Sequence, residues 1–189
     1  MYSPSRRGKD RLLCALLAAV LLAFAVPVLR TGAGRADALS RSACISEELY
    51  SGTVLQESNA DVALPMASTT KIMTALLICE DCDLDRVVTV PDCAVGVEGS
   101  SIYLKKGEEI DVRDLLYGLM LRSGNDSATA LAVIHSGCVD KFTDDMNARA
   151  LELGAKSTHF TNPSGLPDDD HYTTARDLCA IARAAMQND

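Results

Sequence analysis

Ser68 and Lys71 are the first residues whose types and spacing suggest chemistry, in the stretch MASTTKIMTALL that spans residues 66–77. Residues three apart share one face of a helix, so both side chains would project together from a helix that begins near Ser68. The free N–H groups of a first helical turn can bind a developing oxyanion, and the helix dipole together with burial would lower the pKa of Lys71. A neutral lysine can accept the serine proton, so the pair predicts a serine nucleophile with a lysine base.

The Ser-x-x-Lys spacing is weak evidence alone, because it is expected about once by chance in a chain of this length and a serine before an apolar helix is usually an N-cap. The triplet Ser123-Gly124-Asn125, 55 residues downstream of Ser68, strengthens it. The Ser123 hydroxyl could relay a proton to a leaving amine, and the Asn125 amide offers donors and an acceptor to a substrate carbonyl or amide. The two motifs together predict an acyl-transfer site.

The elements that must position these side chains are strands followed by helices. The expected strands cover residues 42–47, 53–57 and 86–90, with turns at 50–52 and 59–61 and a loop over 93–107. The expected helices begin near Ser68 and at Asp111, and cover 126–135, 139–153 and 174–185. Asp111 with Asp114, and Thr174 with Asp177, have the spacing of a capping box. This order indicates an α+β fold, although its N-terminal hairpin has few partners and a lone hairpin is marginally stable.

Three longer stretches carry a resemblance to one family, in order and spacing: LPMASTTKIMTALL, GSSIYLKKGEEIDVRDLLYGLMLRSGNDSATALA and STHFTNPSGLPDDDHYTTARDL. They resemble the serine-type D-alanyl-D-alanine carboxypeptidases, the low-molecular-mass penicillin-binding proteins of peptidase family S11, whose motifs are Ser-x-x-Lys, Ser-x-Asn and Lys-Thr-Gly. The resemblance implies the transpeptidase-like fold shared by β-lactamases and DD-peptidases. It implies that Ser68 is the acyl-enzyme nucleophile and Lys71 its general base. It also implies that Ser123 is the proton-relay hydroxyl and Asn125 a substrate-binding amide.

The reaction implied by this resemblance removes the terminal D-Ala from peptidoglycan pentapeptide stems through a serine ester. The expected ligands are therefore stem peptides that end in D-Ala-D-Ala, and β-lactams, which would acylate the same serine. No cofactor and no metal are expected. Membrane association of a full-length protein is left open.

The third family motif, Lys-Thr-Gly or Lys-Ser-Gly, does not occur in the sequence. The lysine-containing candidates, 105–107 and 156–158, do not spell it and precede the place where it should fall. In the family this missing part also supplies sheet strands beside the N-terminal hairpin and a second oxyanion donor, whose loss typically costs about 10²–10³ in rate. Residues 39–189 are therefore expected to be a C-terminally truncated, partial catalytic domain with little or no activity. Stoichiometric penicillin labelling of Ser68 would contradict that expectation.

Residues 1–38 have the form of a signal peptide. Basic residues at positions 6, 7, 9 and 11 precede an almost wholly apolar run over 12–29, and Ala36-Asp37-Ala38 has the small-x-small form of a signal-peptidase site. Cleavage is expected near Ala38, which would give an exported, extracytoplasmic protein of a bacterial cell envelope. The alternative is an uncleaved membrane anchor, because the apolar run is about long enough to span a bilayer.

The remainder of the chain is acidic and rich in cysteine. Residues 1–38 hold six of the 18 basic and two of the 26 acidic residues, which leaves twelve more acidic than basic residues after position 38. Such a surface repels phosphate backbones, so no nucleic-acid partner is expected. Six of the seven cysteines remain, and buried free thiols are expected ahead of a disulfide framework because Cys44 and Cys179 lie in apolar runs.

Two other functions fit parts of the same pattern. A serine β-lactamase would need a deacylating base, but Glu152, the only glutamate after Asn125, lies in an expected helix rather than a loop. A non-catalytic peptidoglycan-binding module would keep the pocket without cleaving the peptide. A redox or metal role for the pair Cys79 and Cys82 lacks a second ligand pair at zinc spacing. His171, with the aspartates at 168–170, is expected to lie in a solvated loop.

Overall fold

The computed structural model describes residues 42–188. The expected signal peptide and its cleavage site at Ala38 lie outside the described residues. No helix within residues 42–188 has the length and apolarity needed to cross a bilayer.

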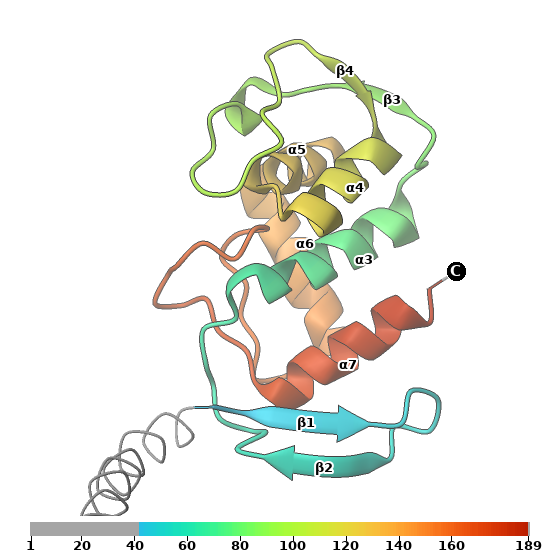
Figure 1. Cartoon of the computed structure of the whole chain (residues 1–189), viewed down its shortest axis with the longest axis vertical. Coiled ribbons are helices and arrows are strands. Elements are labelled where there is room, and N and C mark those ends of the chain that lie inside the picture. Colours follow the sequence, from blue (N-terminus) through green and yellow to red (C-terminus); the bar gives the residue numbers. More distant parts are fainter. Residues whose placement is uncertain (1–41, 189) are drawn as a thin grey trace, which may run out of the picture. The chain divides into compact units, whose positions relative to one another are not determined.

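Helix α3 is the central element of the part that the structure describes. It packs against α4, α5, α6 and α7, and Figure 1 shows it between α4 and α7. Its buried side chains include Met73, Leu77 and Ile78, whose spacing places them on neighbouring faces of the helix. The helical elements are η1 (Ala67–Thr70), α3 (Lys71–Asp81), η2 (Asp92–Ala94), α4 (Val112–Arg122), α5 (Asn125–Ser136), α6 (Val139–Glu152) and α7 (Ala175–Met186).

The strands of the described residues form two antiparallel pairs, which with the helices confirm the expected α+β class. Strand β1 (Cys44–Glu47) pairs with β2 (Val54–Ser58), so the predicted N-terminal hairpin is confirmed. Strand β3 (Val87–Thr89) pairs with β4 (Glu109–Asp111), with Val88 opposite Ile110. Strand β4 was not among the expected strands, because three residues with charged neighbours carry no alternation signal.

The hairpin has a partner in α7, which lies alongside β1 (Figure 1). The Arg176 guanidinium at the start of α7 binds the carboxylates of Glu57 and Asp61 at 2.6 and 2.7 Å. Near the other end of α7, Gln187 Nε2 donates to the Leu49 carbonyl at 3.1 Å. The helix therefore holds both ends of the hairpin, although every residue of β2 remains exposed.

The helix ends test the predicted caps. Thr174 is the N-cap of α7, and its hydroxyl accepts a hydrogen bond from the Asp177 N–H at 3.1 Å, which confirms that cap. Asp111 is the N-cap of α4, but its side chain makes no capping hydrogen bond, so the predicted capping box there is wrong. The helix expected from near Ser68 begins as the 3₁₀ turn η1 and becomes α-helical at Lys71.

The cysteines differ from the expected buried thiols. Cys44 is exposed because it occupies an outward-facing position of β1, and Cys179 on α7 is only partly covered. The other exposed thiols of the described residues are Cys79, Cys93 and Cys138. The apolar neighbours of Cys44 in the sequence alternate across the strand, so they do not indicate on which face the cysteine lies.

Candidate active site

The turn η1 brings Ser68 and Lys71 together. Side chains three residues apart eclipse one another in a 3₁₀ turn, and Lys71 Nζ lies 3.4 Å from Ser68 Oγ. The segment enters this turn through Ala67, which adopts a left-handed φ of 45°. The predicted nucleophile and base therefore face each other at a distance that a bound ligand can shorten, as is common for catalytic hydrogen bonds in free enzymes.

Lys71 is buried, with only 2% of its surface exposed. Its Nζ donates to Asn125 Oδ1 at 2.8 Å and to the Ser164 carbonyl at 2.7 Å. Burial lowers the pKa of Lys71, because the charged ammonium loses its hydration. In the neutral amine the two short hydrogen bonds use both protons. The remaining lone pair is then free to face Ser68, which is the arrangement a general base requires.

The Ser123 hydroxyl reaches the same point from the end of α4. Ser123 follows Arg122 in a left-handed conformation with φ 55°, and its Oγ donates to Ser68 Oγ at 3.1 Å. Asn125 is the first residue of α5, where its Nδ2 donates to the Glu98 carbonyl at 2.7 Å. Together with the Lys71 contact, this means that the structure brings all four predicted site residues into one connected group.

Asp126 is a residue of this region that sequence reasoning missed. It is 1% exposed, and its carboxylate accepts hydrogen bonds from Ser101 Oγ at 2.6 Å and from the Leu104 N–H at 3.1 Å. Burial raises the pKa of Asp126, but the hydrogen bonds, led by that from Ser101, outweigh burial and hold the pKa below its usual value. The carboxylate thereby holds the segment 98–104 against the N-terminus of α5. Asn125 binds the same segment, because its side chain donates to the Glu98 carbonyl and its backbone N–H donates to the Ser100 carbonyl.

A second missed feature is the site loop, residues 161–171, which closes over the start of α3. Besides the Ser164 carbonyl on Lys71, the Pro163 carbonyl accepts from Thr74 Oγ1 at 2.7 Å. Gly165 has a φ of +87°, and a side chain there would strike the Ala67 carbonyl, so the loop and η1 are in direct contact. The sequence signal was the turn-forming run Asn-Pro-Ser-Gly, which indicates a loop but not what the loop touches.

His171, at the end of the site loop, contradicts the expectation of a solvated position. It is 3% exposed, and its Nε2 lies 2.7 Å from Thr70 Oγ1. Burial lowers the pKa of His171 more than the neighbouring Asp168 raises it. The aspartates at 168–170 are exposed as expected. The acidic run before His171 indicates exposure only for the aspartates themselves, because a buried residue can follow directly after a solvated turn.

The two lysine triplets considered for the third motif lie elsewhere. Residues 105–107 form the turn before β4. Residues 156–158 are bound to the N-terminal turn of α7, where the Ser157 N–H and the Thr158 hydroxyl donate to Asp177 at 2.7 and 2.9 Å. Both triplets have structural partners of their own.

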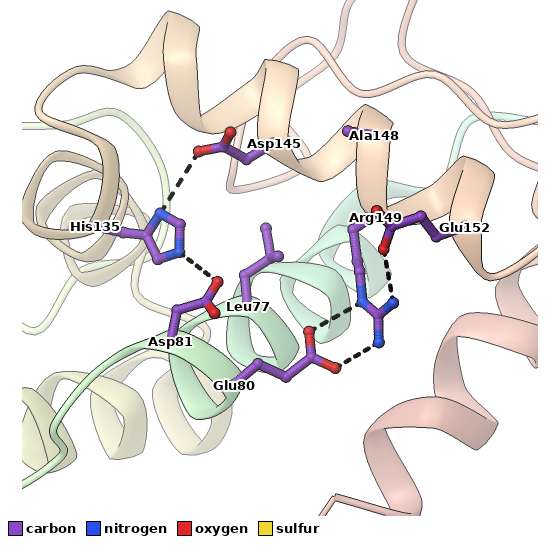
Figure 2. Close-up of a pocket in the computed structure, with 8 residues that line it drawn as sticks. All are labelled: Leu77, Glu80, Asp81, His135, Asp145, Ala148, Arg149 and Glu152. Atoms are coloured by element: carbon purple, nitrogen blue, oxygen red, sulfur yellow. Dashed lines mark hydrogen bonds and ion pairs between the residues drawn. The ribbon is translucent and has the colours of Figure 1, made fainter.

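A pocket of about 470 Å³ between α3, α5 and α6 is separate from this group. Figure 2 shows that Arg149 faces the carboxylates of Glu80 and Glu152, and that His135 lies between those of Asp81 and Asp145. Arg149 binds Glu80 at 2.7 Å and Glu152 at 2.9 Å, and His135 Nε2 lies 3.0 Å from Asp81. Glu152, the only glutamate after Asn125 that the β-lactamase alternative could use as a deacylating base, is therefore held in an ion pair on the wall of this other pocket.

Comparison with known proteins agrees with the geometry. Residues 30–189 match the sequence profile of Peptidase S11, D-alanyl-D-alanine carboxypeptidase. The chain belongs to this family. It is 38% identical over 186 residues to D-alanyl-D-alanine carboxypeptidase DacF of Bacillus subtilis, covering 94% of this chain and 48% of that protein. It is 42% identical over 146 residues to DacB2 of Mycobacterium tuberculosis, covering 76% of this chain and 50% of that protein.

Solved structures show that the fold is that of DD-peptidases. The carboxypeptidase DacD of Francisella tularensis matches with a TM-score of 0.75 and 36% identity, over 77% of this chain and 37% of that one. Penicillin-binding protein 6B of Escherichia coli matches with a TM-score of 0.76 and 31% identity, over 78% of this chain and 50% of that one. The chain thus spans about half or less of the length of these family members.

Proposed function

We propose that the chain carries the acylation centre of a serine-type D-alanyl-D-alanine carboxypeptidase, with Ser68 as nucleophile. The observation that carries the proposal is that Ser68 Oγ lies between Lys71 Nζ at 3.4 Å and Ser123 Oγ at 3.1 Å. A buried lysine with a lowered pKa beside a serine hydroxyl is a base and nucleophile pair that needs no histidine. Family membership supplies the substrate class, a peptidoglycan stem peptide ending in D-Ala-D-Ala.

In the proposed reaction, Ser68 Oγ attacks the carbonyl carbon of the penultimate D-Ala while its proton passes to neutral Lys71 Nζ. The peptide C–N bond then breaks. The proton moves through the Ser123 hydroxyl, which contacts Ser68 Oγ, to the nitrogen of the departing D-Ala. Water hydrolyses the Ser68 ester and restores the serine. A β-lactam would acylate Ser68 through the same steps, with its ring amide in place of the peptide bond.

Asn125 is proposed to bind the substrate amide. Without a ligand its side chain is engaged by Lys71 and by the Glu98 carbonyl, so its amide group is held in one orientation before substrate arrives. The 189 residues contain no Lys-Thr-Gly or Lys-Ser-Gly triplet, and recognition of the substrate carboxylate is accordingly assigned to no residue of this chain. The proposal concerns the acylation chemistry of the four residues present.

The proposed place of action is outside the cytoplasm, at the bacterial cell wall. Peptidoglycan stems are found there, and the basic, apolar and Ala-x-Ala pattern of residues 1–38 supports export followed by cleavage near Ala38. Amino-terminal sequencing of the protein secreted by a bacterial host tests this placement. A mature terminus near residue 39 is expected, and retention of residue 1 on the membrane-bound protein would contradict it.

The function is tested by prolonged incubation with a fluorescent penicillin, followed by mass-spectrometric mapping of the adduct. The expected result is a slowly formed, substoichiometric adduct on Ser68 that is absent from Ser68→Ala and strongly reduced in Lys71→Met, with Ser51→Ala on the hairpin turn as an unaffected control. The extent after long incubation is the readout, because the chain supplies no Lys-Thr-Gly motif to help stabilise the oxyanion. An adduct on another residue, or none at all, would refute the proposed nucleophile.

The same experiment separates the two alternatives. A β-lactamase would release hydrolysed penicillin with repeated turnover instead of retaining the adduct. A non-catalytic module would bind a pentapeptide stem and form no adduct. Release of D-Ala from the pentapeptide, lost in Ser68→Ala, is the result expected for a carboxypeptidase.

A further inference from the structure

The hydrogen bonds of His171 determine its protonation. The backbone N–H of Thr161 donates to His171 Nδ1 at 3.0 Å, so Nδ1 must be unprotonated. The remaining proton of the neutral ring is then on Nε2, which lies 2.7 Å from Thr70 Oγ1 in a buried contact. The imidazole is therefore a donor to Thr70.

Thr70 connects His171 to Ala67, the residue before the nucleophile Ser68. Its hydroxyl accepts from His171 and donates to the Ala67 carbonyl at 2.8 Å. Ala67 has a φ of 45°, a strained conformation for a residue with a Cβ atom, which needs support from its surroundings. The hydrogen bond from Thr70 is such a support.

The Ala67 carbonyl and the Ser68 N–H belong to one planar, trans peptide group, so they point in opposite directions. Holding the carbonyl toward Thr70 therefore aims the Ser68 N–H away from the turn. This N–H has no acceptor among the described residues, and the first bonded N–H of the turn is that of Thr69, to Met66. A free N–H beside the nucleophile is the group that can stabilise an oxyanion.

We propose that His171 is a positioning residue which, through Thr70 and the Ala67 carbonyl, aims the Ser68 N–H at the oxyanion formed during acylation. The inference rests on the proposed acylation of Ser68 and adds a residue to that site from the far end of the site loop. Packing alone does not explain the arrangement. The ring also packs edge-to-face on Phe160, with centroids 5.9 Å apart, but that contact does not require Nε2 to meet Thr70.

A matched pair of substitutions separates the hydrogen bond to Thr70 from the rest of the ring. In His171→Gln the side-chain amide nitrogen can occupy the Nε2 position and still donate to Thr70. In His171→Asn the amide can replace only Nδ1, so the Thr161 contact is kept and the Thr70 contact is lost. We expect Ser68 acylation to fall about tenfold or more in His171→Asn and to be largely retained in His171→Gln, since a misaimed oxyanion donor costs up to about 10²–10³.

A second pair of substitutions tests the Thr70 hydroxyl, which links His171 to the Ala67 carbonyl. Thr70→Ser keeps the hydroxyl and Thr70→Val removes it at nearly equal volume. Thr70→Val should lower acylation as His171→Asn does, and the double variant His171→Asn with Thr70→Val should lose little more than either one. Equal losses in the members of each pair, or full additivity of the two substitutions, would overturn the positioning role.

Hydrogen exchange of the Ser68 to Lys71 amides gives a readout that does not depend on acylation. The amides should exchange faster in His171→Asn and Thr70→Val than in His171→Gln and Thr70→Ser. If wild-type protein forms no Ser68 adduct, the proposed function fails, while this exchange comparison still decides whether His171 orders the turn. Exchange that is unchanged in all four variants would refute the connection.

Discussion

The substitution Asp126→Asn tests whether one buried carboxylate holds in place the segment 98–104, which binds Asn125. In the native chain the two carboxylate oxygens accept hydrogen bonds from Ser101 Oγ and from the Leu104, Ile102 and Ser127 N–H groups, at 2.6 to 3.2 Å. An asparagine has the same shape but only one acceptor oxygen. Its NH₂ group must therefore face at least one N–H donor, whichever way the amide is turned.

The size of the effect follows from these contacts. Hydrogen bonds to a charged group contribute about 1.5–3 kcal/mol each, and those between neutral groups about 0.5–1.5 kcal/mol. In the better of its two orientations, the substituted amide would weaken the bonds to residues 101–104 and lose the one from the Ser127 N–H, which lies 2.9 Å from Oδ1 of the native carboxylate. We expect a loss of about 2–4 kcal/mol in the free energy of unfolding at pH 7. Acylation of Ser68 should fall too, because residues 98–104 hold Asn125.

The assay is urea unfolding at pH 7, with Asp92→Asn as the matched control. The Asp92 carboxylate is 68% exposed in an ion pair with Lys106, and such pairs contribute at most about 1 kcal/mol. The pH dependence has a defined sign. The folded pKa of Asp126 lies below its ordinary value of 3.8, so its stabilisation is present above that value and is lost as the pH falls through the folded pKa. The stability gap between wild type and Asp126→Asn should therefore narrow in acid, and a loss no larger than that of Asp92→Asn would refute the reasoning.

Three further predictions concern other parts of the molecule. The acylation rate should increase with pH, and the midpoint of the increase should lie below 10.5, the ordinary pKa of lysine. Burial lowers the pKa of Lys71, and only its neutral amine accepts the serine proton, so a rate independent of pH would contradict this. Gly165→Ala should lower the free energy of unfolding by more than about 2 kcal/mol, because the new Cβ would strike a carbonyl. Gly96→Ala, with a φ of +74° but open space around it, should cost only about 1 kcal/mol, and equal losses in urea unfolding would exclude the steric cause. Ellman's reagent should modify exposed Cys93 faster than Cys82, whose pKa burial raises, as mass-spectrometric mapping of partial reactions would show.

Much of the fold, and the placement of Lys71 beside Ser68, were predictable because their signals are local. Ser68 and Lys71 are three residues apart on one turn, and no tertiary information is needed to see that they face each other. The N-cap at Thr174 and the helix after Gly124 likewise follow from residue types over a few positions. The position of Asn125 beside Lys71 required the family resemblance, because nothing local relates residues 54 apart.

The missed features depend on contacts between distant segments. His171 follows three aspartates and so carries a polar local signal, yet it is buried because the end of the site loop returns to Thr70. Strand β4 forms because Ile110 pairs with Val88, a partner that a three-residue run does not reveal. Asp111 occupies the N-cap position of α4, but its side chain makes no capping hydrogen bond. The N–H of Val112, the first residue of the helix, donates instead to the Arg86 carbonyl, beside the pairing of β3 with β4.

The contacts around Lys71 also link the reactivity of Ser68 to the completion of folding. Its Nζ meets partners separated from it by 3, 54 and 93 residues, and the neighbouring Thr70 meets His171 across 101 residues. The shortest of these contacts can form as soon as one turn of helix exists, whereas the longest require loops to close at an entropic cost that grows with length. Penicillin reactivity should consequently return late in refolding, after the circular-dichroism signal of the helices has recovered. A covalent label at Ser68 would then mark the molecules in which the most distant segments have met.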